Sequence, residues 1–281
     1  MRTGSILICI LLFLAVLHVS GGSRVDAAGF ALVEQSGKGL GESFAGGPTD
    51  TSDPSSLFYN PAACAFTEEN AIGASLSAID LSAKFKDNGS TDATGRPLTG
   101  GDGGEGGTFN LVPNLYYVQQ VAEGAVIGLS VNVPFGLATK YTKDWKGRYH
   151  GVESDLQVIG ISPTASLQVV PDVLSLGASL NIQYAHAKLT NAIDLGTILA
   201  AAGAPTSPQT LDGFADLSGD DWGVGYSLGM LLNITPETRF GFSYRSKVDH
   251  ELSGDVKFDV PVMARGILDA GGMTNYFVNC D

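Results

Sequence analysis

Cysteine, basic charge and long apolar runs are all scarce in this sequence of 281 residues. Its three cysteines, Cys9, Cys64 and Cys280, have neither the number nor the spacing of a disulfide framework or a metal-ligand motif. A single Cys64–Cys280 pair stays open. Sixteen Lys and Arg stand against 29 Asp and Glu, for a net charge of −13, which disfavours binding to nucleic acid. We expect no metal, no cofactor and no nucleic-acid partner.

The N-terminus carries one short uncharged apolar run, Ile6 to Val16, which is too short to cross a bilayer as a helix. Arg2 precedes this run, and Val25-Asp26-Ala27 places small residues where a signal peptidase reads them. The pattern predicts a cleaved signal peptide at residues 1–27 and therefore an exported protein.

What the sequence has in abundance is alternation with a period of two, beginning near Asn70. Within 173–189 the even positions from Leu174 to Tyr184 are apolar and the odd positions from Ser175 to Gln183 are polar or glycine, and 222–234 and 239–260 alternate in a similar way. The pattern predicts seven strands, at about 71–86, 107–121, 124–137, 155–170, 173–189, 222–234 and 238–260. Loops are expected at 87–106, 138–154 and 190–221, the last with a short helix at 195–202.

Strand length separates a membrane barrel from a soluble sandwich, since both alternate. Soluble strands usually have about 5 to 6 residues, whereas a tilted membrane strand needs about 9 to 11 with an apolar outer band. Most of the predicted strands are longer than a dozen residues, and aromatic residues such as Tyr117, Tyr184 and Trp222 lie near strand ends. With the export signal, this predicts an all-β fold, an antiparallel transmembrane β-barrel in the outer membrane of a Gram-negative cell.

Residues 28–69 do not alternate and are rich in glycine. They hold an Asn-Pro corner, Asn60-Pro61, with Phe58 and Phe66 on either side. From the residues alone, this segment is either an exposed leader arm or a plug that folds into a barrel wide enough to have a lumen.

Several collinear stretches carry a family resemblance. They are "AGFALVEQSGKGLGESFAGG" at 28–47, "NPAA" at 60–63, "VPNLYYV" at 112–118, "FGLATKY" at 135–141, "YAHAKL" at 184–189, "WGVGYSLGMLL" at 222–232 and "FGFSYRSKV" at 240–248. Together they resemble the FadL/TodX family of outer-membrane transporters of long-chain fatty acids and aromatic hydrocarbons.

The resemblance implies a 14-stranded barrel closed by an N-terminal hatch, of which this chain holds about seven strands. The implied domains are a signal peptide at 1–27, a hatch at 28–69 and a partial barrel at 70–281. The implied mechanism is substrate-gated passive diffusion of a hydrophobic compound, with lateral exit at a kinked strand. A half-barrel leaves open edges that hydrocarbon does not tolerate, so we expect a fragment of a longer monomeric protein, or assembly with another half.

The resemblance also assigns residues. Asn60, Pro61 and Ala62 map onto the hatch motif, which is expected to lie against the kink, and the kink maps onto Pro134, Phe135, Gly136, Leu137 and Ala138. Pro134 lacks a ladder donor and Gly136 weakens a strand, so strand pairing is expected to break there. Leu57, Phe58 and Phe66 are predicted to line a hydrophobic substrate pocket. Lys188 is the candidate contact for a substrate carboxylate.

Three alternatives remain open. A general porin would have a wet lumen without a plug, and an adhesin would have no pocket. A barrel enzyme would need convergent catalytic groups, and only His150, in a loop with Asp144 and Glu153, is a candidate; we expect no enzyme. The sequence does not separate fatty acids from aromatic hydrocarbons as substrates. Outer-membrane lipid is the other expected partner.

Overall fold

The computed structural model describes residues 30–67, 69–235 and 237–271. The chain divides into two units, Met1–Phe30 and Ala31–Asp281, and the described helices and strands lie in the second. The predicted signal peptide and Cys280 lie outside the described residues. Among the residues described, no helix is both long enough and apolar enough to cross a membrane.

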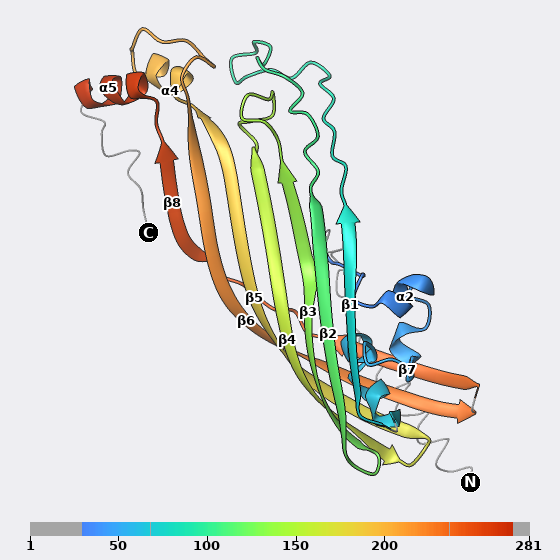
Figure 1. Cartoon of the computed structure of the whole chain (residues 1–281). Coiled ribbons are helices and arrows are strands. Elements are labelled where there is room, and N and C mark those ends of the chain that lie inside the picture. The colour runs from blue at the N-terminus through green and yellow to red at the C-terminus, as the bar shows by residue number, and fades with distance from the viewer. Residues whose placement is uncertain (1–29, 68, 236, 272–281) are drawn as a thin grey trace, which may run out of the picture. The chain divides into compact units, whose positions relative to one another are not determined.

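One antiparallel sheet of eight strands dominates the second unit (Figure 1). The strands are β1 (Ala71–Asp80), β2 (Phe109–Ala122), β3 (Ala125–Lys140), β4 (Glu153–Val170), β5 (Leu174–Asp194), β6 (Asp212–Thr235), β7 (Thr238–Arg245) and β8 (Ser253–Asp259). Strands β1 to β7 lie side by side in chain order, and β8 also pairs with β6. The predicted all-β barrel wall is confirmed.

Alternation gives the sheet two different faces. On β5, Ser175, Ser179 and Asn181 are at most 6% exposed, whereas Leu176 and Leu180 are each 46% exposed. Here we call the face that contacts residues 31–67 the inner face, and the opposite one the outer face. Polar side chains therefore lie inside and apolar ones outside, which is the arrangement of a membrane barrel and the reverse of a soluble sheet.

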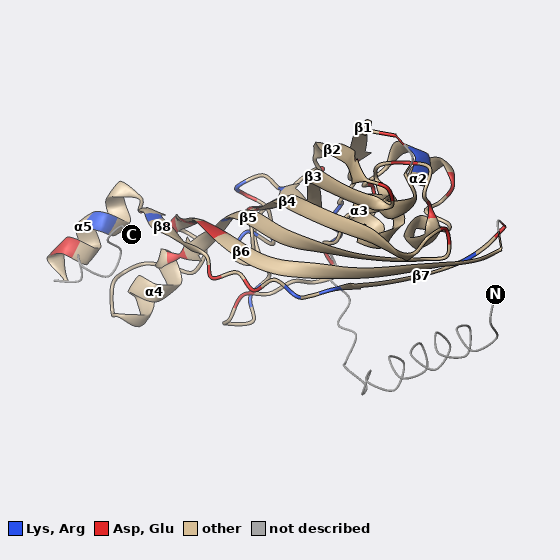
Figure 2. Cartoon of the chain, turned by 90° about the horizontal axis from the view of Figure 1, so that it is seen from below, with Lys and Arg blue, Asp and Glu red and all other residues tan. Residues whose placement is uncertain are grey.

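The middle of the sheet forms a belt without formal charge. Asp, Glu, Lys and Arg are absent from 109–122, 125–139, 156–170, 174–187 and 222–235, and Figure 2 shows charged residues mainly in loops and near strand ends. Aromatic side chains pair on the outer face, with ring centroids 5.2 Å apart for Tyr184 and Trp222 and 6.0 Å apart for Tyr226 and Tyr244. Exposed tyrosines and tryptophans of this kind suit a membrane–water interface.

Two sequence predictions about the last strands are wrong. The expected single strand at 238–260 is two strands, β7 and β8, which pair with opposite ends of β6. The expected loop at 190–221 is shorter, because β5 continues to Asp194 and β6 already begins at Asp212. The predicted short helix within that loop is confirmed as α4 (Leu195–Ala201).

Residues 31–67 form short helices on the concave side of the curved sheet (Figure 2). These are α2 (Gly37–Gly41), η1 (Gly47–Thr49), α3 (Ser56–Tyr59) and η2 (Pro61–Phe66). At the far end of the strands, α4 packs against α5 (Val262–Ala270) through Leu195, Leu199, Ala264 and Leu268.

Candidate functional site

The Asn-Pro corner is bonded into the inner face. Asn60 is fully buried, and its Oδ1 accepts a hydrogen bond of 3.0 Å from the Ala62 amide, which caps the start of η2. Its Nδ2 donates to the carbonyls of Pro48, at 2.7 Å, and Met230, at 3.1 Å. The side-chain amide of Asn60 therefore makes three hydrogen bonds, and all three join it to backbone groups.

The rest of the corner bonds to β4 and β5. The Ser166 hydroxyl donates to the Pro61 carbonyl, the Ser175 hydroxyl to the Ala62 carbonyl at 2.8 Å, and Gln168 Nε2 to the Ala65 carbonyl at 2.7 Å. The inward polar side chains of the strands thus supply donors for the carbonyls of η2.

Two strand glycines make room for the corner. A Cβ on Gly229 would lie 2.1 Å from Asn60 Oδ1, and one on Gly177 would lie 2.4 Å from the Pro61 carbonyl carbon. Real Cβ atoms do not approach other atoms so closely, so glycine is required at both positions. The inner face of β5 and β6 therefore carries a recess shaped for Asn60, Pro61 and Ala62.

A break in pairing separates β2 from β3. The two strands pair from Ala122–Ala125 up to Leu115–Val131, and then again only at the isolated bridge between Gly107 and Thr139. The stretches between, 109–114 and 132–137, do not pair with each other, over about 20 Å at about 3.3 Å per residue. We call this opening the window.

The window begins where the sequence predicts that pairing breaks. The β3–β4 register shifts between Asn132 and Phe135, so Val133 and Pro134 form a bulge against β4. Pro134 has no N–H to offer a neighbouring strand, in line with the loss of pairing to β2. The strand continues beyond it, because Phe135 to Lys140 still pair with β4.

A cavity of about 650 Å³ occupies the window. Its lining includes Leu32, inner-face residues of the sheet such as Val112 and Leu156, and outer-face residues such as Leu111, Gly136 and Ile159. The cavity therefore reaches both faces of the wall, and its walls are mostly apolar.

The segment that touches the irregular part of β3 is residues 31–35. The Leu32 amide donates to the Pro134 carbonyl at 3.0 Å, Ala31 forms a bridge with Phe135, and Gln35 Nε2 donates to the Val133 carbonyl at 2.8 Å. The predicted contact between the Asn60–Ala62 motif and the kink is therefore wrong. The motif bonds to β4, β5 and β6, where the glycine recess receives it.

The three predicted pocket residues are not brought together. Leu57 lies in a core cluster with Cys64, Tyr116, Val118 and Val126, against which Phe58 packs. Phe66 packs in a separate cluster with Ala62, Ala63 and Leu231. The lining of the window cavity includes none of the three. Burial also raises the pKa of the Cys64 thiol to about 12.

Lys188 is not placed to meet a substrate on the inner face. It lies in the same β5 phase as Leu180 and Tyr184, opposite the inward Asn181 and Gln183, so it belongs to the outer face. Its Nζ is 3.0 Å from Glu153 Oε2, which also pairs with Lys140 at 3.3 Å. Its predicted role as a carboxylate contact does not fit this position.

A different cation faces inward. Arg245, at the end of β7, donates a 2.5 Å hydrogen bond to the Phe58 carbonyl and stacks over the Phe58 ring at 4.1 Å. Its partners in the described part of the chain include no carboxylate within ion-pair distance. Sequence reasoning missed it, although Arg239 and Arg245 share the phase opposite to the outward Phe240, Phe242 and Tyr244.

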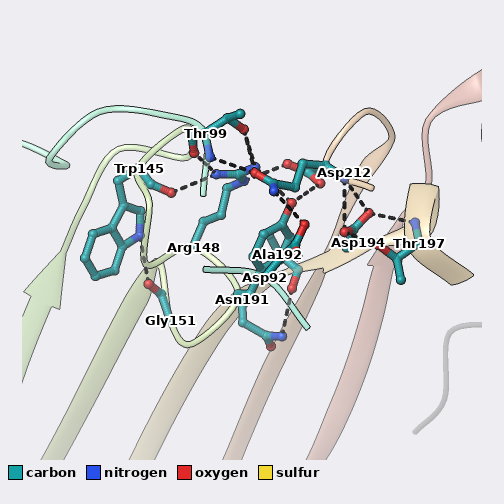
Figure 3. A network of polar contacts seen from close by, with 12 residues as sticks. Asp92, Thr99, Trp145, Arg148, Gly151, Asn191, Ala192, Asp194, Thr197 and Asp212 are labelled. Atoms are coloured by element: carbon teal, nitrogen blue, oxygen red, sulfur yellow. Dashed lines mark hydrogen bonds and ion pairs between the residues drawn. The ribbon is translucent and has the colours of Figure 1, made fainter. Parts of the chain in front are cut away.

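The loops beyond the sheet are held by a polar network around Arg148 (Figure 3). Arg148 is 4% exposed, and its guanidinium donates to Asp212 Oδ2 at 2.7 Å and to the Thr99 carbonyl at 2.6 Å. Gln209 continues the network, with its amide N–H bonded to Asp194 and its side chain bonded to Asp92 and Thr99. Parts of three long connections, 81–108, 141–152 and 195–211, are thus joined.

Two of the described histidines, His186 and His250, form polar pairs with aspartates. His250 Nδ1 lies 3.0 Å from Asp221, and His186 Nδ1 lies 2.7 Å from Asp220. Glu153 is engaged by two lysines, not by His150. Within the described ranges, no group of three or more His, Cys, Asp or Glu residues is arranged to hold a metal.

Residues 18–276 match the protein family described as "Outer membrane protein transport protein (OMPP1/FadL/TodX)". The chain belongs to this family. It is accordingly an outer-membrane protein. The predicted family and location are confirmed.

Individual members support the same assignment. The chain is 29% identical to the long-chain fatty acid transport protein of Escherichia coli O6:H1, over 92% of this chain and 59% of that protein. It is 27% identical to outer membrane protein P1 of Haemophilus influenzae, over 85% and 57%. The chain spans about half the length of the curated relatives it matches, for example 47% and 59%.

Solved structures share the fold. The crystal structure of a Pseudomonas aeruginosa FadL homologue superposes with a TM-score of 0.79 at 27% identity, covering 89% of this chain and 60% of that one. The Ralstonia pickettii toluene transporter TbuX superposes with a TM-score of 0.52 at 23% identity, covering 74% and 56%, which is a likeness of fold alone.

Proposed function

We propose that the protein carries hydrophobic compounds across the outer membrane by passive diffusion and releases them sideways through the window between β2 and β3. The cavity of about 650 Å³ that reaches both faces of the wall carries this proposal. Its size is that of a small-molecule site, and its apolar lining suits an acyl chain or an aromatic ring. In this scheme residues 1–27 are the signal peptide, 28–69 the hatch and 70–281 part of the barrel.

The hatch is attached to the sheet by two separate contacts. Asn60, Pro61 and Ala62 anchor it in the recess of β5 and β6, while residues 31–35 occupy the inner end of the window at Val133 and Pro134. The anchor stays fixed while the window segment moves, so substrate opens the window without unfolding the hatch. Pro134 to Ala138 keep the two strands from closing the window by themselves.

Arg245 is the cation we assign to an anionic head group in place of Lys188. Its present partners, a carbonyl and an aromatic ring, are neutral. A carboxylate makes stronger, bidentate hydrogen bonds with a guanidinium than a carbonyl does. This favours long-chain carboxylates over neutral hydrocarbons as substrates.

Uptake by intact cells tests the transport function. Cells that express the protein should accumulate radiolabelled oleate faster than cells that lack it, and Gly136→Glu should slow uptake because it puts a charge into the window. Gly151→Glu adds the same charge in a loop outside the window and should leave uptake unchanged. Equal uptake in cells with and without the protein, for both oleate and toluene, would refute transport.

The head-group assignment is tested by substrate choice. Arg245→Met should lower oleate uptake and spare toluene uptake, whereas Arg239→Met, on the same face of β7 and bonded to Thr51, should alter neither preferentially. Equal losses for oleate and toluene would mean that Arg245 only supports the hatch. Faster entry of hydrophilic sugars than of either compound would favour a general porin instead.

A further inference from the structure

Strands β2 and β3 are joined by one residue of the hatch at the end of the window. Gln35 donates through Nε2 to the Val133 carbonyl on β3, at 2.8 Å, and its own carbonyl accepts from the Tyr116 hydroxyl on β2, at 2.6 Å. Tyr116 and Val133 lie on either side of the level at which β2 and β3 stop pairing. The bonds of Gln35 therefore join β2 and β3 at the end of the window, where their pairing stops.

The neighbours of Gln35 reinforce both connections. On the β3 side, the Leu32 amide bonds to the Pro134 carbonyl. On the β2 side, Asn114 Nδ2 donates to the Glu34 carbonyl at 3.1 Å. Gln35 Nε2 also donates to the Leu32 carbonyl at 3.1 Å, which holds the turn of the segment in shape. One side chain thus fixes the local fold of residues 32–35 and its attachment to β3.

The closed arrangement is not fully satisfied. Gln35 is 0% exposed, yet its Oε1 has no hydrogen-bond partner, and Asn114 Oδ1 and Ser130 Oγ are likewise buried without partners among the described residues. A buried unpaired polar atom disfavours the state that buries it. Withdrawal of residues 31–35 would let Gln35 Oε1 reach water. The closed state is therefore held by specific hydrogen bonds, which must offset the free-energy cost of burying this unpaired oxygen.

An apolar occupant of the cavity would meet the same segment. The Leu32 side chain lines the cavity, and its Cδ1 lies 3.3 Å from where a Cβ on Gly136 would stand. An occupant that displaces Leu32 would strain two hydrogen bonds at once, the one from the Leu32 amide to the Pro134 carbonyl and the one from Gln35 Nε2 to the Val133 carbonyl. The two are coupled because Gln35 Nε2 also donates to the Leu32 carbonyl.

We propose that Gln35 is the positioning residue that latches residues 31–35 across the window, and that its release from Val133 and Tyr116 is the step that opens it. This inference rests on the proposed lateral exit for its purpose, but its geometry stands independently of any substrate. Gln35 acts through the segment it holds and is not itself assigned a contact with the substrate.

Hydrogen–deuterium exchange, followed by mass spectrometry on the full chain in outer-membrane vesicles, tests the latch without using transport. Gln35→Leu keeps the buried volume but removes the donor to Val133 and Leu32. Peptides that contain Leu32 should then exchange about tenfold faster, the factor that corresponds to about 1.4 kcal/mol. Peptides from β4 and β5 should exchange as in the wild type.

Two further variants provide a second test of the latch and a control. Tyr116→Phe removes the hydroxyl that donates to the Gln35 carbonyl and accepts from Asn132 Nδ2 at 3.3 Å. It should accelerate exchange in the same peptides, and it keeps the test decisive where Gln35→Leu does not fold. Glu42→Gln alters an exposed hatch side chain that pairs with Lys38 at 4.0 Å, and it should change nothing at Leu32. Exchange at Leu32 unchanged in both Gln35→Leu and Tyr116→Phe would overturn the latch.

Kinetics separate this proposal from the transport function. In Gln35→Leu the maximal rate of oleate uptake should rise while the half-saturating concentration stays constant, since the latch governs release and not capture. Faster exchange without any uptake by the wild type would sink the transport proposal and keep the latch. Normal uptake by the wild type, with no effect of either variant on exchange or maximal rate, would sink the latch alone.

Discussion

The side-chain amide of Asn60 lies 3.1 Å from the carbonyl of Met230, 170 positions further along the chain. This bond joins the Asn-Pro corner to β6, whose residues 212–232 all pair with β5. The segment 31–67 is therefore docked on one of the most extensively paired parts of the sheet. Its other end meets the window, where pairing is absent.

Replacing Asn60 tests the anchor. Asn60→Ala removes the N-cap of η2 and two bonds to backbone carbonyls, so we expect docking of the hatch to weaken by about 2–4 kcal/mol. Protease protection of residues 31–67 in vesicles, as a function of urea, measures this change. Asn191→Ala, at an amide that bonds to the adjacent Ala192 carbonyl, serves as the control. Equal protection in the two variants would contradict the anchor.

Filling the recess should have a comparable effect. Gly229→Ala puts a methyl group 2.1 Å from Asn60 Oδ1 and 2.8 Å from the Ala62 amide, so the corner must move away from β6. We expect faster proteolysis of the hatch. The sheet should stay folded, with the same gel mobility as the wild type in unheated samples. Gly41→Ala, where no atom lies within 4 Å, should behave as the wild type. A hatch that remains protected in Gly229→Ala would argue against the recess.

The loop network depends on Arg148. Arg148→Met leaves Asp212 and the Thr99 carbonyl without their cationic donor, and we expect a loss of roughly 3 kcal/mol in the stability of the joined loops. Arg148→Lys should rescue little, because an ammonium lacks the fork that reaches several acceptors. Lys143→Met, at an exposed cation over the Phe214 ring, is the control. Limited proteolysis of loops 87–106 and 195–211 measures the difference.

Loop 87–106 should loosen in acid. A hydrogen bond from Lys146 holds the pKa of Asp87 far below its usual value, and hydrogen bonds from Thr94 and Gln209 do the same for Asp92. A carboxylate with a depressed folded pKa stabilises the loop above the unfolded pKa of about 4. That contribution is lost as the pH falls from about 4 toward the folded value. Amide exchange of the loop at about pH 6 and pH 3 measures it, and Asp87→Asn should reduce the pH dependence.

The alternation of apolar and polar residues was enough to predict the strands of the sheet, but not the places where their pairing breaks. Alternation fixes which side chains of β5 face inward, so Ser175 and Leu176 could be assigned to opposite faces from the sequence. The break between β7 and β8 escaped because alternation continues through it. Seven residues, 246–252, stand opposite six of β6, 221–226. The signal that the sequence offered there is the glycine pair Gly223 and Gly225, where an added Cβ would lie 2.4 Å and 2.8 Å from Val248.

The site was harder to predict than the wall. Pro134 marks the window because a missing N–H is a local property. Which hatch residues meet it depends on how a segment without periodicity folds back over the sheet, and no local rule gives that. Gln35 in particular is one polar residue in a glycine-rich stretch, and its bonds to Val133 and Tyr116 join positions about a hundred and about eighty residues apart.

The β5–β6 hairpin continues well past the uncharged belt. Beyond His186, β5 runs from Lys188 to Asp194 against β6 residues down to Asp212, a rise of about 20 Å at about 3.3 Å per residue. We predict that a hairpin this tall lifts α4 and α5 out of the lipid and to the outer surface of the cell. Antibodies raised against residues 195–211 should therefore bind living bacteria with short surface polysaccharides, and failure to stain such cells would place this end of the hairpin on the periplasmic side.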